Sequence, residues 1–206
     1  MLDKSVEYRT IAMLMEGKKV TSTPEATLPE GFSFRLFNKA EDAAHWARIE
    51  ASVLEFDNED EAEQYFTDEF IPHIDELKRR CIFIQNKDGQ PIATAMGWYS
   101  DCKIPNRLHW VAVCPEYQGL GLGKAVSQKA INVCAAILPD EPMWLRTQTH
   151  SHRAVLMYHK LGFNMVKNKI PLDEEFSYAE DYNGAIEILT EIFRPEEINA
   201  LQETAL

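Results

Sequence analysis

The chain has 206 residues, of which 45% are hydrophobic and 26% are charged, a composition ordinary for one soluble globular domain. Its formal net charge of −12 argues against a general nucleic-acid-binding surface, because such surfaces usually carry a basic patch. No apolar run approaches the roughly 20 residues that span a bilayer, no signal peptide is evident, and the four cysteines lack metal-like or disulfide-like spacing, so we expect a cytoplasmic protein with no membrane partner.

The pattern of the first thirty residues leaves their secondary structure open. Val6–Glu16 fits a strand or a short helix, and Thr21–Pro29 is a polar linker with two prolines. From there to Tyr99, strand-like and helix-like patterns alternate. The expected elements are a strand at Phe32–Phe37, helices at Asp42–Leu54 and Glu61–Phe70, and strands at Cys81–Gln85 and Pro91–Tyr99. Asp88 and Gly89, between the last two strands, indicate a hairpin turn.

The most informative stretch is residues 108–138, where the apolar pattern changes from strand-like to helix-like across three glycines. Leu108–Val113 is an apolar run, and Gly119, Gly121 and Gly123 follow a turn that contains proline. Apolar residues then recur at helical spacing up to Ile137. Glycines at the start of a helix leave backbone N–H groups uncovered, and the helix dipole favours an anion there. The stretch therefore predicts a turn that binds phosphate.

Beyond this helix the chain continues with short elements. The patterns predict a strand at Met143–Thr149, a helix at Ser151–Leu161, strands at Phe163–Ile170 and Ala185–Phe193, and a last short helix that Pro195 opens. Ser151 can cap its helix, and Gly162 can end the same helix in a left-handed conformation.

Two common nucleotide-binding patterns fail at the glycine turn. The Rossmann spacing would need glycine at Lys124, and the Walker A pattern needs a Gly-Lys-Ser/Thr ending. Gln118-x-x-Gly121-x-Gly123 after a strand instead resembles the acyl-CoA loop of the GCN5-related N-acetyltransferases, the GNAT superfamily. Ala154–Phe163, which carries Tyr158 and closes on Leu-Gly-Phe, resembles the second signature of that family.

This resemblance implies an α/β fold, classed as α+β in some schemes. Its central sheet would be mixed and splayed, with helices on both faces, and the strands around Leu108–Val113 and Met143–Thr149 would run parallel. The resemblance covers residues 31–193. Residues 1–30 would then form an N-terminal extension, and residues 194–206 a C-terminal tail with a short helix.

The resemblance also implies acetyl-CoA as co-substrate. In the family the strand at Leu108–Val113 bulges, so the N–H of Val111 would face the acetyl oxygen and Val113 would pair with the pantetheine arm. Ser151 matches a position where the family often has an asparagine that contacts CoA. The pyrophosphate would lie on the backbone of Gln118, Gly119, Leu120, Gly121, Leu122, Gly123 and Lys124.

Two side chains are candidates for proton transfer. Tyr158 has the position of the family's general acid, where a phenol can protonate the CoA sulfur; the alternative is an ordinary core tyrosine. His109 matches a histidine of the arylalkylamine acetyltransferases and suits a general base, while the carboxylate that many members carry is replaced by Arg107. Strand alternation would place His109 and Trp110 on opposite faces. The alternative, that His109 has only a structural role, stays open. In that case the general base would be a water chain, Glu50 or Glu55.

No metal site is expected. His150, His152 and His159 have no cysteine or carboxylate to complete a ligand set. The acidic residues in Glu55–Glu61 would attract a cationic amine if they border the acceptor site, and otherwise form a solvated loop.

The sequence thus predicts an acetyl-CoA-dependent N-acetyltransferase that acts on a small-molecule or peptide amine. The alternatives are a non-catalytic acyl-CoA-binding or regulatory GNAT module and an acetyltransferase of aminoacyl-tRNA, against which the negative charge argues. Homodimer formation stays open.

Overall fold

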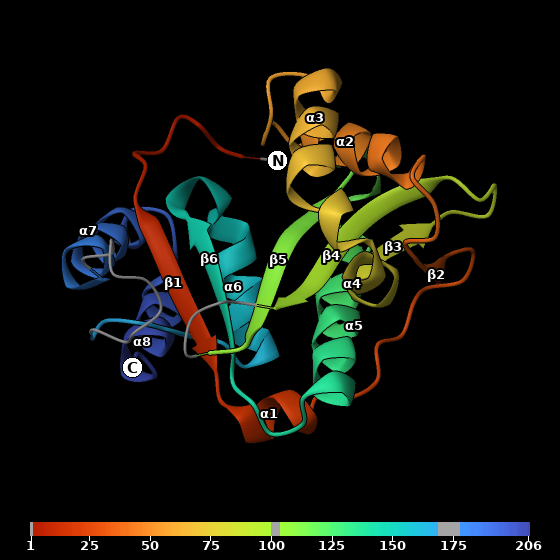
Figure 1. The fold of residues 1–206 in the computed structure, drawn as a ribbon. Coiled ribbons are helices and arrows are strands. Elements are labelled where there is room, and N and C mark those ends of the chain that lie inside the picture. Colours follow the sequence, from red (N-terminus) through yellow and green to blue (C-terminus); the bar gives the residue numbers. More distant parts are fainter. Residues whose placement is uncertain (1, 100–103, 169–177) are drawn as a thin grey trace. The chain divides into compact units, whose positions relative to one another are not determined.

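The computed structural model describes residues 2–99, 104–168 and 178–206 (Figure 1). Within these ranges seven strands pair in the order β2-β3-β4-β5-β6-β1-β7, with parallel and antiparallel neighbours and with flanking helices. This mixed α/β architecture confirms the predicted fold class. The chain divides into two compact units: unit 1 contains Thr23–Trp98 and Leu108–Pro139, and unit 2 contains Leu2–Ser22, Tyr99–Arg107 and Asp140–Leu206.

Unit 1 is built on antiparallel strands that pair β2 with β3 and β3 with β4. Its strands are β2 (Ser33–Leu36), β3 (Cys81–Gln85), β4 (Pro91–Tyr99, up to Trp98) and most of β5 (Asn106–Val113). Its helices are α2 (Asp42–Ser52), α3 (Glu59–Glu69), α4 (Ile74–Arg80) and α5 (Leu122–Ile137). The β3–β4 hairpin turns at Gly89, whose φ is +79°, as the Asp-Gly pair predicts.

Helices cover both faces of the unit 1 strands, and adjacent residues of β4 show this. A Cβ on Gly97 would lie 2.6 Å from the carbonyl oxygen of Ala130, so α5 lies directly against the backbone of that strand. The next residue, Trp98, points the other way, and its ring contacts Phe70 at the end of α3, with 5.1 Å between centroids. Glycine is needed at position 97 because α5 approaches so closely.

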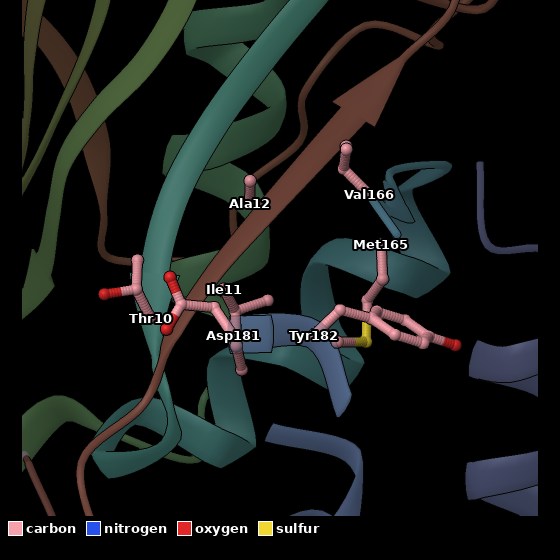
Figure 2. Close-up of a pocket in the computed structure, with 7 residues that line it drawn as sticks. All are labelled: Thr10, Ile11, Ala12, Met165, Val166, Asp181 and Tyr182. Carbon is pink, nitrogen blue, oxygen red and sulfur yellow. The ribbon is translucent and has the colours of Figure 1, made fainter. Parts of the chain in front are cut away.

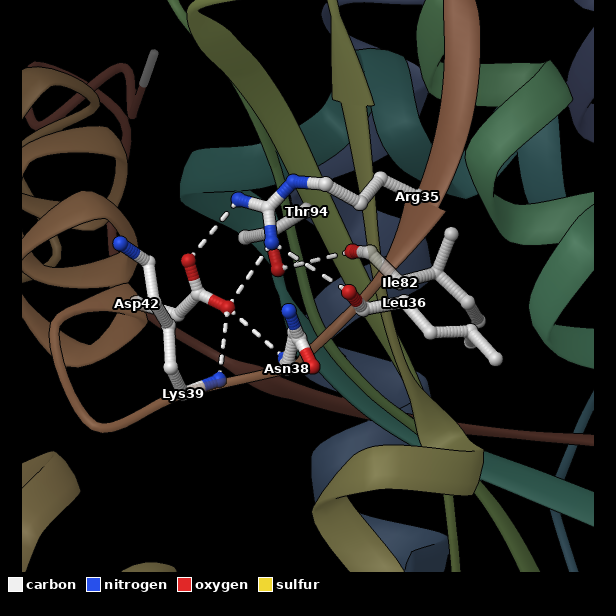
Figure 3. A network of polar contacts seen from close by, with 7 residues as sticks. All are labelled: Arg35, Leu36, Asn38, Lys39, Asp42, Ile82 and Thr94. Atoms are coloured by element: carbon white, nitrogen blue, oxygen red, sulfur yellow. Dashed lines mark hydrogen bonds and ion pairs between the residues drawn. The ribbon is translucent and has the colours of Figure 1, made fainter.

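A buried ion pair holds the start of α2 on β2 (Figure 3). The carboxylate of Asp42 accepts hydrogen bonds from both terminal nitrogens of Arg35, at 2.8 and 2.9 Å. It also accepts from the backbone N–H groups of Asn38 and Lys39, at 2.8 and 3.3 Å. Four donors on one fully buried carboxylate satisfy its oxygens and fix the direction in which the helix leaves the strand.

Unit 2 is built on β1 (Thr10–Met15), which lies between β6 (Met143–Gln148) and β7 (Asn164–Met165) and is antiparallel to both. The first residues of β5 pair with β6 in parallel, with Asn106 opposite Met143 and Arg107 opposite Trp144, which confirms the expected parallel pairing. The helices of this unit are α1 (Gly17–Thr21), α6 (His152–Leu161), α7 (Tyr178–Thr190) and α8 (Pro195–Glu203).

In unit 2, α7 contacts β1 and α8 contacts β7. A small pocket lies beside β1 and α7 (Figure 2). Its lining comes from three segments, namely Thr10–Ala12, Met165 with Val166, and Asp181 with Tyr182. Burial raises the pKa of the Tyr182 phenol, so this hydroxyl stays protonated at neutral pH.

Two sequence predictions on the C-terminal side differ from the structure. Ala185–Phe193 was expected to be a strand, but α7 extends to Thr190. Among the side chains described in this helix, Ala185 and Leu189 are fully buried, and their spacing of four is helical, although Ile186 and Ile188 imitate strand alternation. A strand was also expected at Phe163–Ile170, but the observed strand, β7, is shorter and has only two residues. Positions 169 and 170 lie outside the described residues.

In the N-terminal region, the strand alternative for Val6–Glu16 is confirmed. β1 lies within that range, and all six of its residues pair with β6. The short helices α1 and α4 were not predicted, while α8 confirms the helix that Pro195 opens. None of the described helices is both long and apolar enough to cross a membrane.

Three cysteines lie in the described part of the chain, and all are free thiols in buried positions. Burial raises the pKa of the Cys81 and Cys134 thiols, the latter to about 12. They therefore stay protonated and unreactive at neutral pH, as expected for reduced structural cysteines. Cys102 lies outside the described residues.

Candidate active site

The glycine turn of unit 1 joins β5 to α5 in a backbone conformation that favours glycine. Gly119 and Gly121 have φ values of +81° and +80°. A Cβ at either position would meet no described atom within 4 Å, so the backbone angle and not crowding calls for glycine. The carboxamide Nε2 of Gln118 donates a 2.9 Å hydrogen bond to the carbonyl of Val113, which ties the turn to the end of the strand.

The start of α5 offers backbone donors. Gly121 is its N-cap residue and makes no side-chain capping bond. The hydrogen bond that opens the helix runs from the N–H of Ala125 to the carbonyl of Gly121, at 3.1 Å. The N–H groups of Leu122, Gly123 and Lys124 precede that bond, and the first N–H groups of a helix have no intrahelical acceptor. The turn before the helix is exposed, and the binding of an anion at these N–H groups stays a prediction.

β5 carries His109 and departs from regular strand geometry at the next residue. Trp110 has a φ of +48°, a left-handed conformation that is rare for a bulky residue. It directly precedes Val111, at the point where the family resemblance implies a bulge. Val111 and Val113 are half-buried, while Leu108 and Ala112 are buried.

The prediction that His109 and Trp110 point to opposite faces is wrong. Their ring centroids lie 5.2 Å apart, and the His109 ring also contacts Phe70 at 6.0 Å. The left-handed residue interrupts the pleat, so two consecutive side chains reach the same side of the strand. Nothing in the sequence reveals this, because the strained residue is a tryptophan and not a glycine.

Four rings in unit 1 form what we call the aromatic cluster: Trp46, Phe56, Tyr65 and Trp110. Each ring contacts each of the others, with centroids 5.2 to 6.4 Å apart. Trp46 is fully buried, Phe56 and Trp110 are half-buried, and Tyr65 is 37% exposed. The cluster therefore runs from the core beneath α2 to the surface. Sequence reasoning missed it, since its members come from α2, a loop, α3 and β5.

Glu50 lies one helical turn after Trp46 on the buried face of α2. Its side chain is 1% exposed, and its Oε1 has no hydrogen-bond partner. Burial, with a contribution from the charge of Glu55, raises the pKa of Glu50 well above its ordinary value. A buried polar atom without a partner is costly and rare in folded proteins. The indole Nε1 atoms of Trp46 and Trp110 are, like Glu50 Oε1, buried without a hydrogen-bond partner.

The acidic run after α2 has a structural role. The side chain of Asn58 caps α3 by accepting a 2.9 Å hydrogen bond from the N–H of Glu61. Glu59, Asp60 and Glu61 occupy the first turn of that helix, where negative charge is favourable. All of them are exposed, so they remain able to act on a charged ligand at long range.

Unit 2 contains the predicted acid. Tyr158 is 7% exposed, and its ring packs edge-on against Phe163 at 6.2 Å. The carbonyl of Tyr158 accepts a 3.0 Å hydrogen bond from the N–H of Phe163. Gly162, with a φ of +109°, ends α6 in the left-handed conformation that was predicted. These contacts fix the position of Tyr158 on its helix.

Ser151 and the histidines of unit 2 have local structural positions. Ser151 is the N-cap residue of α6, but the predicted capping bond is absent, because Thr149–Ser151 forms a 3-10 turn that leads into the helix. The ring of His150 packs on Tyr8, and that of His152 on Phe193. Among the described residues, no group of histidine, cysteine and carboxylate side chains could hold a metal ion.

Comparison with known proteins identifies the family of this chain and solved structures with a similar fold. The model of the acetyltransferase (GNAT) family matches residues 34–163. A GCN5-related N-acetyltransferase from Sphaerobacter thermophilus has a similar structure, with a TM-score of 0.58 at 18% identity over 78% of this chain and 49% of that one. A GNAT-family acetyltransferase from Colwellia psychrerythraea has a TM-score of 0.54 at 15% identity over 77% of this chain and 54% of that one.

A Drosophila protein, with a TM-score of 0.56 at 17% identity, is similar over 77% of this chain and 48% of its own. At these identities the likeness concerns the fold. The chain spans about half the length of these solved structures. Comparison with curated proteins gave no match.

Proposed function

Because this chain belongs to the acetyltransferase (GNAT) family, we propose that it is an acetyl-CoA-dependent N-acetyltransferase that acts on a primary amine. The observation that supports this most directly is the glycine turn. Two left-handed glycines open onto unfilled space at the uncapped start of α5, where backbone N–H groups are available to an anion. The pyrophosphate of acetyl-CoA is the group that this arrangement fits.

In this proposal the backbone binds the co-substrate. The residues from Gln118 to Lys124 hold the pyrophosphate, and Val113 pairs with the pantetheine arm. The N–H of Val111, which follows the left-handed Trp110, faces the acetyl oxygen and stabilises the negative charge that develops on it. Ser151, whose hydroxyl makes no capping bond, is available to contact CoA.

Two side chains move protons in the proposed reaction. His109 accepts a proton from the amine, since an alkylammonium cannot attack the thioester carbon. The amine nitrogen then forms a bond to the acetyl carbon as the bond from that carbon to sulfur breaks, and the nitrogen gives up its second proton to water as the neutral amide forms. Tyr158 donates its phenolic proton to the departing sulfur and regains one from water. The reaction yields the N-acetylated amine and free CoA.

The test is a panel of primary amines incubated with acetyl-CoA, with release of the CoA thiol as the readout. An N-acetyltransferase releases thiol only when an amine and the protein are both present. A protein that binds acetyl-CoA in calorimetry but releases no thiol with any amine is a non-catalytic acyl-CoA-binding module. The assignment of His109 is tested by pH–rate profiles of the wild type and of His109→Gln: we expect an acidic limb in the profile of the wild type and its loss in that of the variant.

A further inference from the structure

Tyr117, the residue directly before the glycine turn, contacts the β3–β4 hairpin through its side chain. It ends the 3-10 turn Pro115–Tyr117, and Gln118 follows it. Its phenolic oxygen accepts a 3.1 Å hydrogen bond from the carboxamide Nδ2 of Asn86, and its ring packs edge-on against Phe32 at 6.2 Å. Asn86 and Tyr117 are 31 residues apart in the sequence, so this hydrogen bond joins two separate segments of unit 1.

Asn86 is held in one orientation by the hairpin turn. Its Oδ1 accepts hydrogen bonds from the N–H groups of Asp88 and Gln90, both at 3.0 Å. Its backbone N–H donates to the carbonyl of Gln90, and its carbonyl accepts from the N–H of Gly89, also at 3.0 Å. Because two N–H groups donate to Oδ1, the carboxamide nitrogen faces the other way, which is toward Tyr117. The hairpin therefore presents a fixed donor to the tyrosine.

The glycine turn itself has few contacts that fix its conformation. Residues 118–121 are all exposed. Its glycines have a wide choice of backbone angles, so ordering them costs more entropy than ordering other residues. On the C-terminal side the turn is held by Leu122, which is buried at the start of α5. On the N-terminal side it is held by the hydrogen bond that Gln118 donates to β5 and by the side chain of Tyr117.

We propose that Tyr117 is a positioning residue, whose contact with Asn86 holds the free glycine turn in the conformation that binds the pyrophosphate of acyl-CoA. This inference rests on the proposed function, and it adds the turn of the β3–β4 hairpin to the parts of the fold on which co-substrate binding depends. A turn that is ordered in advance loses less entropy on binding, so more of the interaction energy appears as affinity. In this role Tyr117 acts through the turn and not through a contact with the ligand.

The experiment removes the hydrogen bond and keeps the ring. Tyr117→Phe retains the packing against Phe32 but loses the acceptor for Asn86 Nδ2. We expect the affinity for CoA, measured by calorimetry, to fall by about three- to tenfold, the scale of one hydrogen bond. NMR order parameters of the Gly119 and Gly121 amides in the free protein should fall as well, because they report the flexibility of the turn directly.

A second variant tests whether Asn86 is the partner through which Tyr117 acts. Asn86→Ala removes the donor on the hairpin side and should lower the affinity for CoA at least as much as Tyr117→Phe does. In the double variant the loss should not exceed that of Asn86→Ala alone, because the contact is already absent.

Tyr8→Phe is the matched control. The hydroxyl of Tyr8, in unit 2, also accepts one side-chain hydrogen bond, from Thr10 Oγ1 at 3.4 Å. Its removal should leave the affinity for CoA unaltered. Thermal melts of all the variants show how much stability each change costs, which separates a loss of turn order from a general loss of stability.

If Tyr117→Phe keeps the CoA affinity and the order parameters of the wild type, the inference is overturned, even where the melting temperature falls. An equal loss in Tyr8→Phe, or additive losses in the double variant, overturns it too. If the amine panel shows acetyl transfer while Tyr117→Phe binds CoA like the wild type, the inference fails and the proposed function stands. If CoA affinity depends on Tyr117 but no amine is acetylated, the positioning role stands and the proposed function fails. A wild type that binds no CoA overturns both.

Discussion

At the scale of single residues, function and stability depend on how buried polar groups are satisfied. Asp42 has four hydrogen-bond donors, whereas Glu50, two turns further along α2, has an oxygen with none. The pKa values of the two carboxyls consequently shift in opposite directions. Burial opposes ionisation in both, but the Arg35 guanidinium and the backbone N–H groups outweigh it at Asp42 and lower its pKa, while the pKa of Glu50 is raised.

Removing the charge of Asp42 should destabilise the fold. In Asp42→Asn, Arg35 loses its ionic partner at the start of α2, so we expect a loss of about 3 kcal/mol in the free energy of unfolding, as for other broken buried pairs. Glu197→Gln, which breaks the exposed pair with Arg194, should cost much less. Urea titration at pH 7 measures both changes.

The effect of Asp42 should also depend on pH. Because the pKa of Asp42 is lower in the folded state than in the unfolded state, its contribution is complete above the unfolded value of about 3.9 and is lost as the pH falls through the folded value. The gap in stability between wild type and Asp42→Asn should therefore be constant near neutral pH and shrink in acid. A gap that widens in acid would contradict the ionised pair.

Tyr158→Phe tests the proposed acid by removing one oxygen atom. If the phenol protonates the departing sulfur, kcat should fall by about 10²-fold or more, the usual scale for a general acid. The affinity for acetyl-CoA should change little, because the ring keeps its packing against Phe163. Stopped-flow turnover and calorimetry give the two quantities. Equal kcat values for variant and wild type would assign the acid to another group.

At the scale of elements, the glycine turn and the helix that follows it were predictable because their signals are local. Left-handed glycines, the apolar run before them and the helical spacing after them lie within thirty residues. The same holds for β3 and β4, whose observed bounds are those that the sequence predicts.

Elements whose signals are ambiguous or non-local were missed. The isoleucines of α7 fit a strand as well as a helix, and only burial of Ala185 and Leu189 decides between them. The aromatic cluster depends on side chains from four segments and on a tryptophan in a left-handed conformation, which no short pattern encodes. Periodicity thus predicts elements, but it does not predict a site that tertiary contacts assemble.

The function of the turn is tested by Gly121→Val. A valine here would have to adopt a φ near +80°, so the turn should rearrange and the affinity for CoA should fall by at least tenfold. Gly31→Val is the matched control, since Gly31 also has a positive φ, +88°, and open space for a side chain. Both variants should lose similar stability in thermal melts. If both bind CoA like the wild type in calorimetry, the pyrophosphate does not lie on this turn.

At the scale of the whole molecule, the net charge of −12 is the property most accessible to experiment. Much of this negative charge is exposed on the surface. Exposed charge can have two effects, one that depends on the whole surface and one that is local. A uniform negative charge keeps a protein soluble, whereas a local concentration of charge steers a ligand toward one place. The acidic residues before and within the first turn of α3 are such a concentration, beside the exposed end of the aromatic cluster.

Salt dependence distinguishes these two effects. Interactions of exposed charges are screened beyond about 8 Å at physiological ionic strength, so if this run attracts a cationic acceptor, the acceptor KM should rise with added salt. A triple variant that neutralises Asp57, Glu59 and Asp60 should show the raised KM already at low salt, with a weaker response to further salt.

Neutralising Glu191, Glu196 and Glu203 in unit 2 removes the same number of charges elsewhere and serves as the control. Steady-state kinetics with the best amine of the panel at several NaCl concentrations measures all three proteins. If only the first variant departs from the wild type, the acidic run steers the acceptor. If both variants shift equally, the net charge of the molecule is responsible, and if neither shifts, the run serves only the start of α3 and solubility.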